Sequence, residues 1–417
     1  MGMISDNTRT RFGRRRPYFL IGAPLVFLAF IMMWFPLSSG TEVSKVIFYI
    51  FAFVLMNTVT TIVQVPFLSM ASELSTDYNE RTSISNIRMI VSVSATIICA
   101  VVPHEIIKAY RDAGDVNSGY IVMSIAFGLL FTLPYFLVFF KVKERKQFSK
   151  GRKSTWRELF GPMRLRVFRK FMVLYLGVIL SMDVIAMIFV YFMTYNLGRY
   201  DELNFVLGAL LIAEVSFVPV ASWFAKKTSK PCAVIAGNLA WTAAAASIFL
   251  VSSDSPIAVV YIVACAIGAS LAFSLIGYQA IFSDVTEVGE YHFGYRAEGS
   301  FYGIQQFIRK CLAAVANGGV LLLLGLSGFV SPVEVIEDGI SIMVEQEQSP
   351  ETLFMIRAIL GFVAIIFLIP STIVAIRWKL SKEKHGKLIN YLDRKRAGLD
   401  ISEEEEQEVS EICKPLI

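Results

Sequence analysis

Charged residues are scarce in this chain of 417 residues. Asp, Glu, Lys and Arg make up only 18% of it, whereas 55% of the residues are hydrophobic and the mean hydropathy is +0.59. So apolar a composition excludes an ordinary water-soluble domain and indicates a membrane protein. The net charge is +5, but the basic residues stand in short blocks between long apolar runs, which argues against a nucleic-acid partner.

The usual signatures of catalytic and metal-binding proteins are also missing. No HExxH, GxSxG, GxGxxG or Walker motif occurs, so we predict no enzyme activity, no catalytic residues, no metal ligands and no cofactor. The 5 cysteines have no paired spacing, which argues against both a disulfide framework and a zinc site. A basic segment leads into the first apolar run without a small-residue cleavage site, so we predict no signal peptide.

Long apolar runs dominate what is present. A bilayer core of about 30 Å needs about 20 apolar residues in a helix, and about ten stretches approach or exceed this length. The sequence therefore predicts an all-α, polytopic membrane protein. The predicted spans are 17–37, 45–71, 84–105, 119–140, 171–198, 203–225, 231–252, 256–283, 299–327 and 352–377.

The distribution of positive charge predicts the orientation of these spans. Most of the 39 Lys and Arg residues lie in alternate loops and at both ends. The opposite loops hold only Lys45, Lys108, Arg111 and Arg199. Because cytoplasmic loops carry the positive excess, we expect both termini of this chain to lie in the cytoplasm and the protein to reside in the plasma or cytoplasmic membrane.

The basic segment 141–170 divides the spans into four before it and six after it. We therefore expect an N-terminal helical bundle at 1–140, a cytoplasmic central loop at 141–170 and a C-terminal six-helix bundle at 171–377. Basic turns that end in proline open a span in each half, and an internal repeat of this kind is typical of transporters. Residues 378–417 form a charged tail, which we expect to be a solvated helix or a disordered end.

Ionisable side chains inside the spans need a partner or a function, since each costs on the order of 2.5–3.5 kcal/mol at the bilayer centre. Asp183, Glu214 and Lys310 lie near the middle of their spans, with Arg309 next to Lys310. Each predicts either a structural ion pair, a carboxyl group kept neutral, or a functional group.

Polar side chains also recur at helical spacing in two spans. Steps of four, four and seven place on one face Tyr302, Gln306, Lys310 and Asn317. Steps of four and three place on another face Asn57, Thr61 and Gln64. Such residues can simply join helices, but two stripes with a buried lysine favour a water-lined cavity that holds a solute.

A third group of ionisable residues lies at the predicted cytoplasmic surface. Opposite charges at loop ends can form ion pairs that hold two helix bundles closed on one side. We predict that ion pairs of this kind form a cytoplasmic gate, and its residues would be Asp6, Arg14, Arg15, Glu80, Arg81, Asp284 and Arg296. The alternative is a set of solvated loops.

Three stretches resemble one known family. They are "GMISDNTRTRFGRRRP" at the start, "PFLSMASELSTDYNERTSISNIR" after the second predicted span, and "SDVTEVGEYHFGYRAEGSFYGIQQFIRK" before the ninth. At this spacing they resemble the glycoside-pentoside-hexuronide:cation symporters of the major facilitator superfamily, which include melibiose permease and plant sucrose transporters. The resemblance implies a fold of two bundles and an expected twelve helices, of which the first two would precede this chain. It places the family's paired cation-binding aspartates on a helix ahead of residue 1.

The resemblance also implies roles for single residues. The positions that resemble the family's solute-binding residues are Thr61, Gln64, Arg88 and Lys310. The polar stripe adds Gln306 as a further candidate. Gln64 stands where the family has an acidic sugar-binding residue. We therefore expect a secondary transporter that couples a sugar, glycoside or uronide to Na⁺ or H⁺ by alternating access, with a small solute, a cation and the bilayer as its partners.

Two alternatives remain open. The first alternative is a carrier of the same fold that transports a lysolipid or another amphiphile, because sodium-coupled lysolipid carriers share the ancestry of these symporters. The second is a membrane protein without transport activity, either a remnant or a sensor, because the family's cation-binding helix would lie ahead of this chain.

Overall fold

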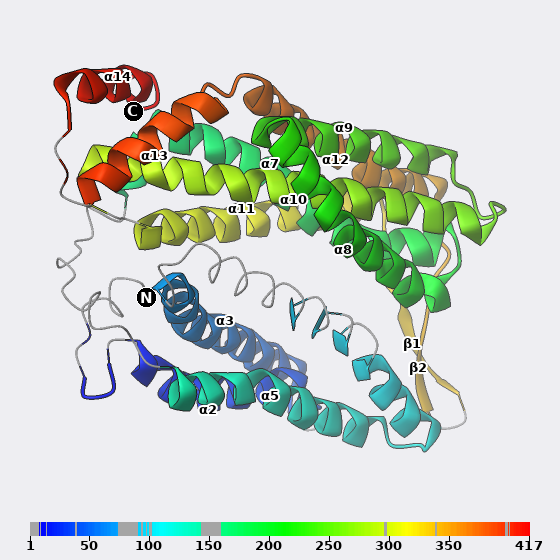
Figure 1. The fold of residues 1–417 in the computed structure, drawn as a ribbon. Coiled ribbons are helices and arrows are strands. Elements are labelled where there is room, and N and C mark those ends of the chain that lie inside the picture. The colour runs from blue at the N-terminus through cyan, green and yellow to red at the C-terminus, as the bar shows by residue number, and fades with distance from the viewer. Residues whose placement is uncertain are drawn as a thin grey trace. The chain divides into compact units, whose positions relative to one another are not determined.

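The computed structural model describes residues 8, 10–13, 15–37, 40–73, 91–92, 95–96, 98–99, 102–142, 160–295, 298–337, 340–396, 399 and 401–417. The chain divides into two compact units, Met1–Leu159 and Phe160–Ile417. Figure 1 traces the helices of each unit in order along the chain.

Helices make up nearly all of the described structure, as the apolar runs predict. Within the described residues, nine helices are long and apolar enough to cross a membrane. The all-α, polytopic prediction is therefore confirmed. Of the ten predicted spans, 84–105 falls largely outside the described residues, although residues 102–112 are helical.

Among its described residues, the N-terminal unit is built around three long helices. They are α2 (Arg16–Trp34), α3 (Glu42–Glu73) and α5 (Val116–Lys141). α2 packs against both of the others, and its buried Phe19 stacks on Tyr135 of α5 at 6.3 Å between ring centroids. Pro17 stands in the first turn of α2, where a missing N–H costs nothing.

A tight turn precedes α2 in the arginine-rich segment. The backbone groups of Thr10 and Gly13 bond each other at 3.1 and 3.3 Å, and the φ of 113° at Gly13 is one that glycine adopts without strain. Arg16 then donates to the carbonyl of Phe139 at the end of α5. The arginine-rich start of the chain is thus partly a structural clamp between α2 and α5.

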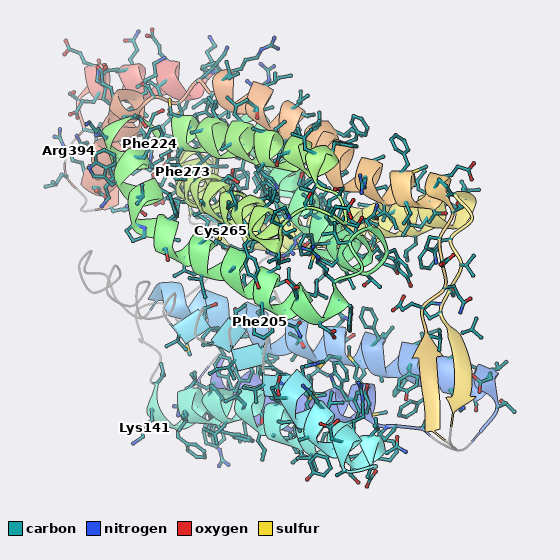
Figure 2. The ribbon with its side chains drawn as sticks, turned by 90° about the vertical axis from the view of Figure 1, so that its right-hand side faces the viewer. Lys141, Phe205, Phe224, Cys265, Phe273 and Arg394 are labelled. Atoms are coloured by element: carbon teal, nitrogen blue, oxygen red, sulfur yellow. The ribbon has the colours of Figure 1, made fainter. Side chains whose placement is uncertain are left out.

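The C-terminal unit contains six long helices. They are α7 (Arg166–Tyr191), α8 (Leu203–Lys227), α9 (Lys230–Ser247), α10 (Ile257–Phe293), α11 (Glu298–Leu326) and α12 (Pro350–Ile376). α10 packs on α8 and α9, whereas α12 packs on α7 and α9. In Figure 2, Phe224 of α8 and Phe273 of α10 mark one of these contacts, with ring centroids 5.6 Å apart.

Short elements connect these helices. A 3-10 turn (Gly161–Arg164) precedes α7, and a π-helical turn (Phe192–Asn196) and a 3-10 turn (Tyr200–Glu202) lead from α7 to α8. Another 3-10 turn (Ile248–Leu250) ends α9. Between α11 and α12, β1 (Val333–Glu337) and β2 (Ile340–Val344) pair as an antiparallel hairpin, with Val333 opposite Val344. The hairpin is a small addition to the predicted all-α fold.

A buried polar network joins four helices of this unit. The Asn238 amide of α9 donates to Ser371 Oγ at 3.0 Å and to Thr372 Oγ1 at 3.2 Å, both on α12. Asn238 Oδ1 accepts from Ser274 of α10 at 2.8 Å, and Ser371 donates to the carbonyl of Leu174 on α7. Polar side chains of this kind stabilise helix contacts where water is absent.

The charged tail forms two helices, α13 (Lys382–Arg396) and α14 (Glu403–Cys413). Arg394, labelled in Figure 2, joins them through both carboxylate oxygens of Glu405 at 2.6 and 2.8 Å. The backbone N–H of Val167 at the start of α7 donates to the carbonyl of Leu416 at 2.8 Å. Of the two expectations for the tail, a solvated helix or a disordered end, the tail is helical. It is packed onto the bundle rather than fully solvated.

Candidate functional site

An ion pair joins two membrane-spanning helices of the C-terminal unit. Arg309 Nη2 of α11 lies 3.1 Å from Asp183 Oδ1 and 3.4 Å from Oδ2 on α7. The side chains are 22% exposed for Asp183 and 35% for Arg309, so the pair lies at an accessible surface of this unit. Both charges are compensated, and both retain hydrogen-bonding capacity for a polar solute.

Tyrosines surround this pair. Tyr175 of α7 and Tyr278 of α10 interact electrostatically with Arg309, and their rings meet edge-to-face at 5.3 Å. Tyr302, two turns before Arg309, packs edge-on against Phe282 at 5.3 Å but is still 40% exposed. Tyr302 also interacts electrostatically with Tyr175 and Tyr278, so its exposed ring adds a stacking face and a hydroxyl to this group of tyrosines.

One turn from Arg309 lies a buried amide. Gln305 is 4% exposed, and its Oε1 has no hydrogen-bond partner among the described residues. The prediction from sequence singled out the neighbouring Gln306, which is half-buried, whereas Gln305 is the residue turned into the protein. A buried, unsatisfied carbonyl oxygen is an acceptor that a solute hydroxyl could use.

Glu214 of α8 stands at an apolar cavity of about 140 Å³ in the same unit. Every other lining residue is apolar, and the cavity also involves Met182 and Ala186 of α7, which flank Asp183 within one turn. Trp241 lies on another wall at 1% exposure, and its indole N–H has no acceptor among the described residues. The ion pair and the cavity are thus neighbours along α7.

The residues of the predicted polar stripe on α11 lie on its more accessible side. Lys310 and Tyr302 are exposed, and Gln306 and Asn317 are half-buried. The residue that pairs with Asp183 is Arg309, one position from the lysine that the sequence favoured. No signal in the stripe distinguishes the two, since only the rotation of α11 against α7 decides which of them meets the carboxylate.

On α3, the polar stripe bonds to its own helix. Asn57 donates to the carbonyl of Phe53 at 3.0 Å, and Thr61 Oγ1 donates to the carbonyl of Asn57 at 2.7 Å. Thr61 is half-buried and Gln64 is exposed. These bonds satisfy the side-chain donors of Asn57 and Thr61 within the membrane-spanning segment.

Several predicted residues lie outside the described part of the chain. Of the predicted solute site, Arg88 lies outside it. Of the predicted gate, the residues outside it are Asp6, Arg14, Glu80, Arg81 and Arg296. Of the gate residues that are described, Arg15 is buried at the start of α2, and Asp284 is 4% exposed near the end of α10.

Asp284 belongs to a charged cluster within the C-terminal unit. Lys230 Nζ at the start of α9 lies 2.5 Å from Asp284 Oδ1, and His385 Nε2 of α13 lies 3.1 Å from the same oxygen. His385 and Lys230 were missed because nothing in the sequence connects segments that lie 101 and 54 positions from Asp284.

Comparisons with known proteins agree with this architecture. The chain is 24% identical over 410 residues to the glucuronide carrier protein homolog of Escherichia coli (strain K12), covering 95% of this chain and 83% of that protein. It is 25% identical to the isoprimeverose transporter of Lactiplantibacillus pentosus over 339 residues, or 79% of this chain and 69% of that protein. It is 23% identical to the sodium-dependent lysophosphatidylcholine symporter 1 of Mus musculus over 362 residues, or 78% and 67%.

A solved structure and a family model also match this chain. A crystal structure of the nucleoside transporter NupG superposes with a TM-score of 0.50 at 12% identity, covering 90% of this chain and 84% of that one, which shows a shared fold. The family model for MFS/sugar transport proteins matches residues 1–382. The chain therefore belongs to the MFS/sugar transport protein family and is a multi-pass membrane transporter.

Proposed function

We propose that this chain is a secondary transporter that couples a sugar, glycoside or uronide to Na⁺ or H⁺ by alternating access. The observation that supports this most directly is the Arg309–Asp183 pair, which is accessible yet lies in the middle of membrane-spanning helices. An ion pair in this position is expensive to maintain for packing alone, and ionisable groups in such segments mark solute or ion pathways. The names of the bacterial relatives add the substrate class.

In this proposal the side chains near the Arg309–Asp183 pair bind different parts of the solute. Arg309 donates two hydrogen bonds to vicinal hydroxyls or to a uronate carboxylate, for which the planar guanidinium is well suited. Asp183 accepts a hydrogen bond from one solute hydroxyl, and Gln305 Oε1 accepts a hydrogen bond from another. Tyr302 stacks on the apolar face of the ring. Thr61, Gln64, Gln306, Arg88 and Lys310 remain proposed contributors to the same solute path.

The coupling ion and the gate are proposals of the same kind. A cation that binds only together with the solute makes uptake follow the cation gradient. Asp6, Arg14, Arg15, Glu80, Arg81, Asp284 and Arg296 would close the cytoplasmic side through ion pairs. The positive charge of the loops supports a cytoplasmic location for both ends of this chain.

A specific observation also favours a second candidate, an amphiphile carrier. The apolar cavity beside Asp183 has about the volume of an engineered cavity of about 150 Å³ that binds benzene. It could take part of an alkyl chain while the head group binds at Arg309. The lysophosphatidylcholine symporter among the relatives is consistent with this reading.

One experiment separates the two candidates. The full chain is reconstituted in proteoliposomes, and uptake of radiolabelled glycosides, uronates and a lysophospholipid is measured with and without imposed Na⁺ and pH gradients. The first proposal predicts gradient-driven glycoside or uronate uptake that a lysophospholipid does not inhibit. Gradient-driven uptake of the lysophospholipid alone would support the second, and no uptake of any kind would contradict both.

A further inference from the structure

Two helices of the C-terminal unit bring three metal-binding side chains together. Asp284 and Glu287 lie one turn apart near the end of α10, and His385 lies in the first turn of α13. Figure 1 shows α13 beside this end of α10. The cluster belongs neither to the Arg309–Asp183 pair nor to the apolar cavity.

The distances among these ligand atoms suit a small cation. His385 Nε2 lies 2.5 Å from Glu287 Oε2 and 3.1 Å from Asp284 Oδ1, and one ligand atom from each residue lies within 4.8 Å of the others. In a tetrahedral zinc site with bonds of about 2.0–2.2 Å, neighbouring ligand atoms are about 3.4 Å apart. The Asp284–His385 separation is already near this value, and Glu287 needs to move away from His385 by less than about 1 Å.

We propose that Asp284, Glu287 and His385 form a binding site for a divalent transition metal, with Zn²⁺ as the best match. One imidazole nitrogen and two carboxylate oxygens are ligands that zinc prefers, whereas Mg²⁺ and Ca²⁺ prefer oxygen alone. A water molecule would complete the coordination. Such a metal ion joins α13 to α10 and so fastens the tail to the bundle.

The charges around the cluster support this assignment. Among the described residues, the ammonium group of Lys230 pairs with Asp284, whereas Glu287 contacts His385. The next carboxylate along α10, Glu290, is engaged by Arg396 at 2.5 and 2.9 Å. With a neutral imidazole, Asp284, Glu287 and Lys230 together carry one negative charge in excess. A divalent cation compensates this excess more fully than Lys230 alone.

Lys230 is also the competitor of the metal. Its ammonium group lies 2.5 Å from Asp284 Oδ1, and its side chain is 36% exposed, so it can turn away into solvent when a metal binds. The proposal therefore makes two opposite predictions for neighbouring residues. Loss of His385 weakens metal binding, and loss of the Lys230 charge strengthens it.

The test uses the full chain, purified with a tag that contains no histidine and treated with a chelator. Zn²⁺ binding is measured by isothermal titration calorimetry, and Co²⁺ binding by visible absorption. We expect one Zn²⁺ per chain, and His385→Ala and Glu287→Gln should each weaken binding at least about 10-fold. His292→Ala is the control, since His292 is an exposed histidine near the end of α10 outside the cluster, and it should leave the affinity unchanged.

Lys230→Met provides the second variant. It should bind Zn²⁺ more tightly than the natural chain, and its thermal midpoint should rise more on addition of Zn²⁺. Equal affinity in the natural chain and in His385→Ala, or no saturable binding of Zn²⁺ in the micromolar range, would overturn the proposal. A thiolate-to-Co²⁺ charge-transfer band would also overturn it, because the proposed site contains no cysteine.

Discussion

Arg309 of α11 donates to both carboxylate oxygens of Asp183 of α7, at 3.1 and 3.4 Å. The two residues are 126 positions apart in sequence, and both lie in membrane-spanning segments. The pair therefore fixes the rotation of α11 against α7 and sets which face of α11 is accessible.

The first prediction concerns the contribution of this pair to stability. Asp183→Asn and Arg309→Gln should each lower the thermal midpoint in detergent, because each leaves one charge without its partner. The double variant, Asp183→Asn with Arg309→Gln, should lose less than the sum of the two single losses, because it leaves no charge unpaired, and the double-mutant cycle measures this difference. A double variant whose loss equals the sum of the two single losses would show that the ion pair does not stabilise the helix contact.

The second prediction concerns the buried network of Asn238. Replacing Asn238 by Ala removes three hydrogen bonds at a fully buried position, so the free energy of unfolding should fall by about 0.6–1.7 kcal/mol per lost interhelical bond. Thr242→Ala is the control, since the hydrogen bond that Thr242 makes among the described residues stays within its own helix, to the carbonyl of Asn238. Similar midpoints for both variants would mean that the network contributes little.

The third prediction concerns the close approach of α8 and α10. A Cβ atom on Gly268 would collide with the carbonyl oxygen of Leu210 and lie 3.1 Å from the backbone nitrogen of Glu214. Gly268→Val should therefore force the helices apart and cost about 1–3 kcal/mol. Gly208→Ala adds its methyl group in open space and should be neutral within error in the same thermal assay. Equal stability of the two variants would contradict the packing described.

The fourth prediction concerns Cys413 in α14. Burial raises the pKa of this thiol to about 12, so it remains protonated and unreactive at pH 8. Its contribution to stability is fully present below the ordinary thiol pKa of about 9 and is lost as the pH rises from there toward 12. Maleimide at pH 8 should label the exposed Cys232 at least about 10-fold faster than Cys413. Comparable rates would show that α14 leaves the bundle readily.

The sequence predicts the helices of this protein well and their contacts poorly. Apolar runs long enough to span a bilayer locate α2, α3, α5 and α7–α12 to within a few residues at most ends, because length and hydropathy are local properties. α10 is the main exception. It continues ten residues past the predicted end at 283, since the polar segment after Asp284 stays helical and packs against α13.

The contacts at the candidate site depend on tertiary packing. Helical spacing finds the accessible stripe of α11 and, within it, favours Lys310. Adjacent residues on a helix point about 100° apart, so only the contact with α7 shows that Arg309 meets Asp183. For the same reason, helical spacing could not show that Gln305, and not Gln306, turns into the protein. The sequence also gave no signal for the network of Asn238, because a single Asn among apolar residues is equally compatible with many partners.

We infer that the pair of Arg309 and Asp183 binds the transported solute. The most direct measurement is gradient-driven uptake in proteoliposomes, once a solute has been identified, for the natural chain, Arg309→Gln and Lys310→Ala, with Gly208→Ala as a folded control. On this inference we expect Arg309→Gln and Lys310→Ala to lose at least about 10-fold in uptake, or about 1.4 kcal/mol of solute binding, at equal protein insertion. Uptake by Arg309→Gln at the natural rate and with the natural apparent affinity would contradict it.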